Sequence, residues 1–259
     1  MKILITGSNG KIGSVIKSQI GKVIKSNFEK CDVLNRDISF DTLSTFYDLI
    51  IHCAANTRNH SIYENDVIKY MDDNVFLTKK LLDIRSSRFV FLSTTALYPK
   101  SFDVKDENSK IDINDIEDMY GITKFISECL IRQYHQDHLI LRCVHVLHNY
   151  LNLPKSIVSM KEHHKTTLSS DTYYNFILVD DILNVLNEYM KSKVSNETVN
   201  VASDDVCSIK DVESIVGKVA YGNYTIDMRN VKTTKLKNLF PMIKINSSIN
   251  NLKPLLKYE

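Results

Sequence analysis

The sequence lacks several features that would place it in other classes of protein. Its 259 residues carry a formal net charge of only +2, which gives no electrostatic reason to expect binding to nucleic acid or to a membrane surface. No apolar run approaches the length of a membrane span, and the chain opens directly on a strand pattern. We therefore expect a cytoplasmic protein without a signal peptide, large enough for one α/β unit with a small appendage.

Cysteine is also sparse and is poorly placed for a disulfide framework. The five cysteines are odd in number, widely spaced and never arranged as C-x-x-C, so we expect reduced thiols that are mostly core residues. Two histidine pairs, His135 with His138 and His163 with His164, are better read as solvated or packed side chains than as ligands. We expect no metal site.

Glycine is scarce as well, and this makes its placement informative. The chain has seven glycines, and three of them follow the apolar segment 2–6 at positions 7, 10 and 13. Gly7 allows a tight exit from a strand, Gly10 lets the backbone approach a pyrophosphate, and Gly13 permits close packing of a helix on the strand. We predict a dinucleotide-binding turn with the phosphates at the N-terminus of the following helix. The residues expected to contact the cofactor there are Gly7, Asn9, Gly10, Lys11, Ile12 and Gly13.

Strand and helix patterns alternate along the first part of the chain. Apolar segments typical of strands fall at residues 2–6, 22–26, 31–34, 49–54, 89–93 and 139–146. Helical patterns cover residues 11–20, 66–83 and 120–135. This alternation predicts an α/β fold with a doubly wound parallel sheet, the Rossmann type, with helices on both faces.

The strict alternation ends after residue 146, and a smaller lobe is expected there. Residues 148–175 read as polar and irregular, a short strand follows at 176–179, and a helix over 181–191 has Asp180 as its expected N-cap. Residues 198–201 predict another buried strand, and Ser208 with Asp211 predicts a capping box. We divide the chain into a dinucleotide-binding domain, residues 1–147 plus about 172–203, and a discontinuous substrate lobe, residues 148–171 plus 204–259.

The catalytic chemistry is predicted at two places. Tyr120 and Lys124 stand four residues apart, hence on one face of a helix, where the cation would stabilise the phenolate and make Tyr120 a usable proton donor or acceptor. The buried strand 89–93 runs into hydroxyl residues including Thr94 and Thr95, at the carboxyl end where ligands bind in such sheets.

Together these residues resemble the extended short-chain dehydrogenase/reductases, and within them the NAD(P)-dependent nucleotide-sugar epimerase/dehydratase group. The similarity extends over almost the whole chain. It is carried by Thr6, Gly7, Gly10 and Gly13; by Asp37 and Ile38; by Cys53, Ala54 and Ala55; by Asn74, Val75 and Thr78; by Thr94, Tyr120 and Lys124; by residues 176–181; and by residues 198–203. The resemblance implies that Asp37 and Ile38 lie beside the adenine, that the alanines let the backbone pass the cofactor, and that Asn74 belongs to the cofactor-binding set.

The resemblance also implies a mechanism and a dimer. Thr94 would bind the substrate oxygen, Tyr120 would exchange its proton, and Lys124 would hold the nicotinamide ribose and lower the pKa of the tyrosine. Helices 66–83 and 120–135 would pair across a two-fold axis, through apolar positions that include Val67, Met71, Val75, Ile122, Phe125, Ile126 and Cys129.

Departures from the family pattern narrow the activity. Thr94, Thr95 and Ala96 replace the Thr-Asp-Glu of the dehydratases, which argues against a sugar 4,6-dehydratase. Tyr174 and Asn175 replace an Arg-Asp pair, so a usual phosphate contact is in doubt. The candidate substrate contacts are Thr94, Thr95, His145 and Arg229, with Asn149 a weaker one; a plain surface position remains the alternative for Arg229.

The cofactor preference depends on the tip of the second strand, which we place at residues 23–27. This segment has no acid to accept hydrogen bonds from the ribose hydroxyls, and Ser26 and Arg36 are polar or basic candidates nearby. We therefore favour NADP(H), with NAD(H) possible. The predicted function is a nucleotide-linked 4-keto sugar reductase; the alternatives are a nucleotide-sugar epimerase with tightly bound NAD and a non-catalytic NADP-binding regulator.

Overall fold

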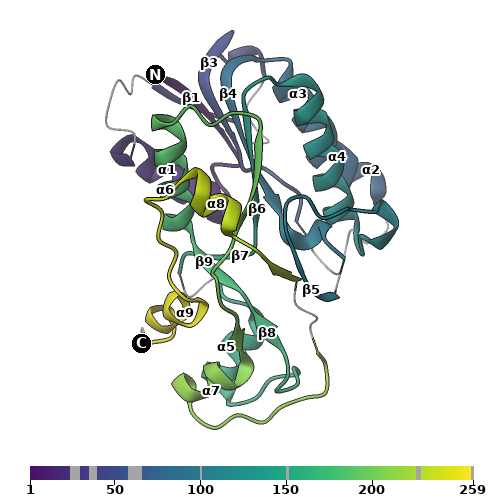
Figure 1. The fold of residues 1–259 in the computed structure, drawn as a ribbon, viewed down its shortest axis with the longest axis vertical. Helices are drawn as coiled ribbons and strands as arrows, with labels where there is room; N and C mark the ends of the chain where they lie inside the picture. Colours follow the sequence, from purple (N-terminus) through teal and green to yellow (C-terminus); the bar gives the residue numbers. More distant parts are fainter. Residues whose placement is uncertain are drawn as a thin grey trace.

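A parallel sheet between two layers of helices forms the larger part of the molecule (Figure 1). The computed structural model describes residues 1–23, 30–34, 40–57, 66–99, 101–149, 152–225 and 229–257. The sheet contains β1 (Lys2–Thr6), β2 (Lys30–Leu34), β3 (Phe46–His52), β4 (Arg85–Thr94), β6 (His138–Cys143) and β10 (Glu197–Val201). Its order is β10-β6-β4-β3-β1-β2, and every pairing is parallel. The predicted Rossmann architecture is therefore confirmed.

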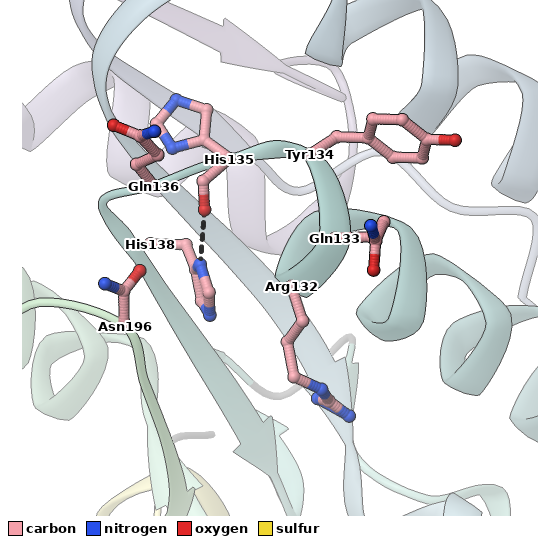
Figure 2. A pocket seen from close by; sticks show the side chains of 7 residues that line it. All are labelled: Arg132, Gln133, Tyr134, His135, Gln136, His138 and Asn196. Atoms are coloured by element: carbon pink, nitrogen blue, oxygen red, sulfur yellow. Dashed lines mark hydrogen bonds between the residues drawn. The ribbon is translucent and has the colours of Figure 1, made fainter.

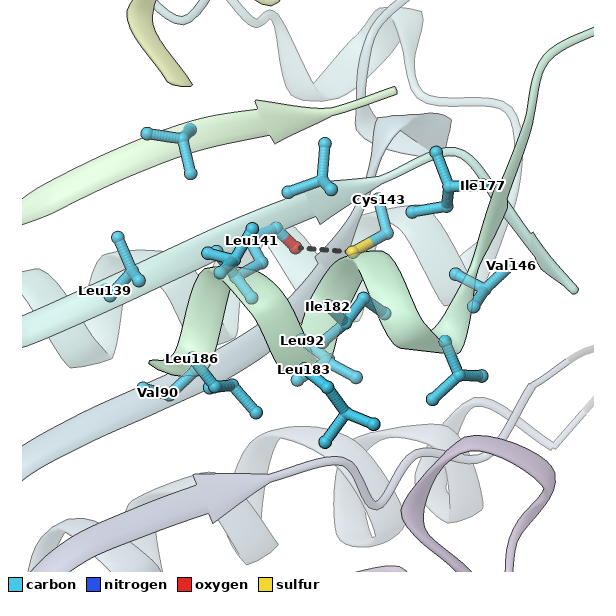
Figure 3. Packing of buried hydrophobic residues seen from close by; sticks show 14 of the residues in the cluster. Val90, Leu92, Leu139, Leu141, Cys143, Val146, Ile177, Ile182, Leu183 and Leu186 are labelled. Atoms are coloured by element: carbon cyan, nitrogen blue, oxygen red, sulfur yellow. Dashed lines mark hydrogen bonds between the residues drawn. The ribbon is translucent and has the colours of Figure 1, made fainter. Parts of the chain in front are cut away.

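Helices cover both faces of this sheet. On one face lie α1 (Lys11–Val23) and α6 (Val179–Lys191), and on the other α2 (Val67–Tyr70), η2 (Met71–Phe76), α3 (Leu77–Leu82) and α4 (Met119–Tyr134). Successive strand residues point to opposite faces, so neighbours in the sequence belong to different cores. Ile3 and Ile5 pack under α1 and α6, while Leu4 packs under α3 and α4. Figure 3 shows the first of these cores, where Ile182 and Leu186 of α6 lie against side chains of β4 and β6.

Helical backbone runs from α2 through η2 into α3, in agreement with the single predicted helix. The middle segment, η2, has π-helical hydrogen bonding. Such bulges occur frequently at functional sites, and this one contains Asn74.

A smaller lobe follows the carboxyl end of the sheet, below it in Figure 1. It contains α5 (Lys155–His163), β8 (Tyr173–Tyr174), β11 (Cys207–Ser208), α7 (Ile209–Val216) and α9 (Ser248–Lys257), which share a separate apolar core. The parallel pair β7 (His145–Leu147) and β9 (Phe176–Leu178) connects the sheet to this lobe. The remaining elements are η1 (Phe40–Thr42), η3 (Thr95–Leu97), β5 (Ser101–Lys105), η4 (Ile113–Asp115), β12 (Arg229–Val231) and α8 (Thr234–Leu239). No described helix is both long enough and apolar enough to cross a bilayer.

Three local expectations are wrong. Residues 22 and 23 do not begin a strand; they end α1, because the spacing of Ile16, Ile20 and Val23 continues the helix face that packs on the sheet. The tip of the second strand was expected at residues 23–27, but residue 23, the described part of that segment, is helical. The strand that pairs with β1 is β2. The irregular segment also contains α5, whose Ile157 and Met160 are buried in the lobe core.

Of the two helix caps predicted from the sequence, that of α6 is wrong and that of α7 is confirmed. Asp180 is not the N-cap of α6: the helix begins at Val179 with Leu178 as the cap, and the Asp181 carboxylate accepts the Leu178 N–H at 2.8 Å. The predicted capping box of α7 is confirmed, since Ser208 Oγ accepts the Asp211 N–H and the Asp211 carboxylate accepts the Ser208 N–H.

Candidate active site

The glycine turn between β1 and α1 has the geometry that a dinucleotide cradle needs. Gly7 has φ 67°, and a Cβ there would lie 2.7 Å from the backbone of Ala54. A Cβ on Gly13 would lie 2.3 Å from the carbonyl oxygen of Gly7, so α1 packs on the turn only because residue 13 is glycine. A Cβ on Gly10 would meet only the Gly7 oxygen, at 3.1 Å. The backbone at Gly10 is therefore open to an approaching phosphate.

The start of α1 lies on the exposed side of the glycine turn, next to the open backbone of Gly10. Asn9, Gly10 and Lys11 are exposed, whereas Ile12 is half-buried and packs against the core. The first N–H groups of a helix have no partners within it and favour an anion. These residues fit a dinucleotide cofactor, with its pyrophosphate at the N-terminus of α1.

The end of β3 lies directly beside this turn. The Thr6 hydroxyl accepts the Ala54 N–H at 3.1 Å and bonds to His52 Nδ1 at 2.7 Å. Cys53, Ala54 and Ala55 are half-buried, so the small side chains leave the backbone accessible next to Gly7. The predicted cofactor residues of β1 and β3 are therefore neighbours in the fold.

The elements that carry the predicted proton-transfer residues pack together at the carboxyl end of β4. Thr94 ends this strand, and its hydroxyl oxygen accepts the Ala96 N–H at 3.1 Å, which leaves the O–H hydrogen as a donor. Tyr120 lies half-buried in the first turn of α4, which packs on the η3 turn after Thr94. A Cβ on Gly121 would lie 2.6 Å from Ile116 Cγ2 and 3.1 Å from the Ala96 oxygen. Gly121 is thus what lets Tyr120 approach the end of β4.

Lys124 follows one turn later on α4 and is almost fully buried. Lys124 is only 1% exposed, and its Nζ lies 3.9 Å from the centroid of the Phe91 ring. Burial disfavours the ammonium form and lowers the pKa of Lys124 to about 8, although Cys53 and Glu128 nearby act in the opposite direction. Lys124 therefore lies buried one helical turn from Tyr120, on the same side of α4.

Asn74 connects the cofactor side of the site to α4 through buried hydrogen bonds. Its Oδ1 accepts the Asn56 N–H at 2.6 Å, and its Nδ2 donates to Thr123 Oγ1 at 2.8 Å. Asn74 is 1% exposed, so it holds the segment after β3 against the turn between Tyr120 and Lys124. This is the position of the predicted cofactor residue; direct contact with a cofactor stays a prediction.

A second buried chain of polar groups runs below Asn74. His52 Nε2 bonds to Thr78 Oγ1 at 3.0 Å, and that hydroxyl donates to the Asn74 carbonyl oxygen at 2.6 Å. Burial, assisted by the charge of Lys124, lowers the pKa of His52 well below its usual value. His52 is therefore a neutral ring that fixes β3 against the π-helical segment.

His145 lies at the entrance to the lobe. It is exposed and edge-on to the rings of Tyr174 and Phe176, with centroids 6.4 and 5.6 Å away. The surrounding protein lowers the pKa of His145 by removing water from the ring, and the charge of Lys11 lowers it further. The predicted substrate residue therefore lies where β7 pairs with β9, next to Tyr174 and Phe176.

The two positions that replace the Arg-Asp pair have local partners. The Tyr174 hydroxyl bonds to Ser156 Oγ at 3.0 Å. Asn175 is buried; its Nδ2 donates to the carbonyl oxygens of Ser203 and Asp205, and its Oδ1 accepts the Ser203 N–H. Asn175 therefore joins β9 to the segment after β10.

Several predicted residues are not placed at the site. Ser26, Arg36, Asp37 and Ile38 lie outside the described residues. Arg229 begins β12, which pairs with β5, and only its backbone is described. Thr95 is buried in the η3 turn. The described residues contain no group of three or more His, Cys, Asp or Glu that could hold a metal ion, and the described cysteines are free: Cys143 and Cys207 are buried, Cys53 is half-buried and Cys129 is exposed.

A surface recess lies at the opposite end of β6, around the C-terminal end of α4 (Figure 2). It is lined by Arg132, Gln133, Tyr134, His135, Gln136, His138 and Asn196. Burial lowers the pKa values of both histidines, and Arg132 is paired with Glu128. Since ligands of open α/β sheets bind at the carboxyl ends of the strands, we place the active site at Thr94 and not at this recess.

Solved structures show the same fold at low sequence identity. A UDP-glucuronic acid 4-epimerase from Bacillus cereus in complex with NAD matches with a TM-score of 0.80 and 20% identity, over 100% of this chain and 96% of that chain. The structure of RMD from Pseudomonas aeruginosa complexed with NADPH matches with a TM-score of 0.76 and 16% identity, over 98% of this chain and 97% of that chain. At these identities the likeness establishes the fold alone. No curated protein matches the sequence.

The sequence itself matches a family model over residues 3–202, from β1 to the end of β10. That stretch contains the glycine turn, Thr94, Tyr120 and Lys124, whose arrangement is described above. The chain belongs to the NAD dependent epimerase/dehydratase family.

Proposed function

We propose that the protein is a reductase of a nucleotide-linked 4-keto sugar that uses Thr94, Tyr120 and Lys124. The observation that supports the proposal is the packing of α4, which carries Tyr120 and Lys124, on β4 and on the turn that follows Thr94. The two positions after Thr94 are Thr95 and Ala96, so this turn holds no carboxylate pair for an elimination reaction. When a bound nicotinamide supplies the hydride, reduction of a carbonyl asks the protein for a proton donor and for groups that orient the substrate, and these three side chains suit both tasks.

The proposed roles of the three side chains follow from the family resemblance and from the chemistry of each group. Thr94 donates its O–H hydrogen to the substrate oxygen and orients the carbonyl. Tyr120 gives its phenol proton to that oxygen as the alcohol forms. The Lys124 ammonium would stabilise the resulting phenolate and would hold the nicotinamide ribose. When bound, the nicotinamide supplies the hydride.

We further propose that NADP(H) is preferred over NAD(H). Because residues 22 and 23 belong to α1, the argument from residues 23–27 no longer holds, and the relevant strand end is that of β2. Arg36 follows β2 by two positions in the sequence, and an arginine there accommodates a 2′-phosphate. Asp37 comes next, and the family resemblance puts it beside the adenine, which leaves Arg36 as the residue proposed to meet the 2′-phosphate.

A second candidate function is nucleotide-sugar 4-epimerisation with retained NAD. It is supported by the likeness to a UDP-glucuronic acid 4-epimerase in complex with NAD, the more similar of the two structures above. An epimerase oxidises and then reduces the same substrate, so it gains from a cofactor that never leaves. A reductase exchanges cofactor at every turnover.

Calorimetric titration of the purified protein with NADPH and NADH separates the two candidates. We expect protein that purifies largely free of cofactor and binds NADPH about tenfold more tightly, about 1.4 kcal/mol. Turnover is then measured with a panel of nucleotide 4-keto sugars. Co-purifying NAD, or a preference for NADH, would refute the reductase proposal and favour the epimerase.

A further inference from the structure

A buried ionic cluster lies one helical turn beyond Lys124. Glu128 on α4 is fully buried and Arg142 on β6 is 3% exposed. Arg142 Nη2 donates to Glu128 Oε2 at 2.7 Å, and Arg142 Nε donates to Oε1 at 3.1 Å. The Ser93 hydroxyl donates to Oε1 at 2.6 Å, and Arg132, on the outer side, donates to Oε2 at 2.9 Å. The carboxylate therefore binds three separate side chains.

The cluster joins β6 to the two elements that carry the proton-transfer residues, β4 and α4. Ser93 immediately precedes Thr94 on β4, and Arg142 lies directly opposite Ser93 in the sheet. Tyr120, Lys124 and Glu128 follow one another at intervals of four residues, on one side of α4. Glu128 thus fixes the helix that carries Tyr120 and Lys124 to the strand end that carries Thr94.

Fold stability alone is a poor explanation for this arrangement. Removing two charges from water costs several kcal/mol per ion, and apolar side chains of similar volume often stabilise a core as well or better. What the ion pair adds is a fixed orientation of α4 relative to β4 and β6, because a carboxylate held by several donors allows only one geometry. A small displacement of reacting groups reduces rates strongly, so such a fixed orientation is of use at an active site.

The charge of Glu128 also acts on Lys124. The groups around the Lys124 ammonium are His52 at the end of β3, Cys53 directly after it, the Phe91 ring from β4, Cys143 from β6, and Glu128 from α4 itself, with Tyr120 one turn before Lys124 on the same helix. Burial lowers the pKa of His52 and raises the pKa values of the Cys53 and Cys143 thiols, so all three groups are uncharged near neutral pH. Glu128 is the anion of this set, and it favours the protonated lysine.

We propose that Glu128 is a positioning residue whose buried carboxylate, held by Arg142, keeps Tyr120 and Lys124 opposite Thr94 and keeps Lys124 charged. This rests on the proposed function for its catalytic consequence only. Its electrostatic part concerns Lys124 in the protein without substrate, and can be measured even if the substrate class is wrong.

The test compares Glu128→Gln with Arg132→Gln. Glu128→Gln keeps the shape of the side chain and removes its charge, whereas Arg132→Gln removes the half-exposed outer arginine and leaves the Arg142 pair intact. The Cε resonance of Lys124 is followed by NMR against pH, with Lys124→Met used to assign it. Steady-state rates are then measured on the substrate found above.

For Glu128→Gln we expect the Lys124 midpoint to move down by about one pH unit. We also expect kcat to fall about tenfold with little change in KM for cofactor, and the upper limit of the pH–rate profile to move down with the lysine. Arg132→Gln should stay close to wild type in each measurement. A folded Glu128→Gln protein with unchanged Lys124 titration and unchanged kcat would overturn the proposal.

Glu128→Gln leaves Arg142 buried without its anion, and the variant protein could fail to fold for that reason. A second variant therefore tests the proposal independently. The double substitution Glu128→Met, Arg142→Met removes both charges and keeps the volume. We expect it to fold, with kcat reduced about as much as in the single variant. A folded double variant with wild-type kcat, or one that cannot fold, overturns the proposal, since the cluster would then be dispensable or purely structural.

Discussion

The close packing of α1 on the glycine turn gives a sharp prediction for Gly13→Ala. The new Cβ would lie 2.3 Å from the Gly7 oxygen and 2.8 Å from the Gly7 carbonyl carbon, against ordinary contacts of 3.4 Å or more. The helix must therefore move by about 1 Å, and such overpacking costs about 1–3 kcal/mol. The gain of up to about 1 kcal/mol from replacing glycine by alanine inside a helix offsets part of this cost.

The assay is thermal unfolding followed by circular dichroism, with a matched control in the same helix. We expect Gly13→Ala to lower Tm by several degrees, since 1 kcal/mol corresponds to about 2–4 °C in a domain near this size. Gly21→Ala makes the same change at an exposed position of α1 and should raise Tm by about 2–4 °C.

Cofactor affinity provides the second readout of the same prediction. The displaced α1 should weaken NADPH binding by Gly13→Ala at least about tenfold, or 1.4 kcal/mol, because the helix N-terminus then no longer points at the pyrophosphate. A Gly13→Ala protein as stable as Gly21→Ala, with wild-type cofactor affinity, would refute this reading of the turn.

Three further predictions concern the proton donor, the buried histidine and the assembly. Tyr120→Phe should leave folding and cofactor binding nearly unchanged and reduce turnover by about 10²–10⁴-fold, since it removes one acid/base hydroxyl; near wild-type rates in steady-state assays would exclude Tyr120 from the mechanism. Thr78→Val leaves His52 Nε2 without its bond at 3.0 Å and should lower the free energy of unfolding by about 1–3 kcal/mol in urea titration, whereas no loss would contradict the structural role of that chain. Light scattering at micromolar concentration should give the mass of a dimer, because Val67 and Phe76 expose apolar surface on the helices that are expected to pair; Val75, expected in the same stripe, is instead buried, and a monomeric mass would argue against the assembly.

Much of the candidate site could be predicted from local sequence. The turn is predicted by its three glycines, because a Cβ at each position would approach nearby backbone: that of Ala54 for Gly7, and the Gly7 oxygen for Gly10 and Gly13. Tyr120 and Lys124 share a helix face by spacing alone. Gly121 was missed, although a glycine inside a helical pattern is a signal of close packing.

Other features depended on partners far away in the sequence. The end of α1 was misjudged because residues 22–26 are apolar enough for a strand, and only packing of Ile16, Ile20 and Val23 on the sheet extends the helix. The helix α5 was missed because its apolar face is short and gains stability from the lobe core.

The sequence by itself determined the parallel sheet, the cofactor turn and the spacing of the phenol and the ammonium, since all three are written in short-range periodicity and glycine placement. Only the tertiary structure decided the environment of Lys124, whose pKa of about 8 arises from burial between β3, β4 and β6. It also decided the cluster of Glu128, Ser93 and Arg142, in which Ser93 and Glu128 are hydrogen-bonded although they lie 35 positions apart. Burial and charge pairing are set by which strands become neighbours, and strand order is a property of the fold rather than of any local segment.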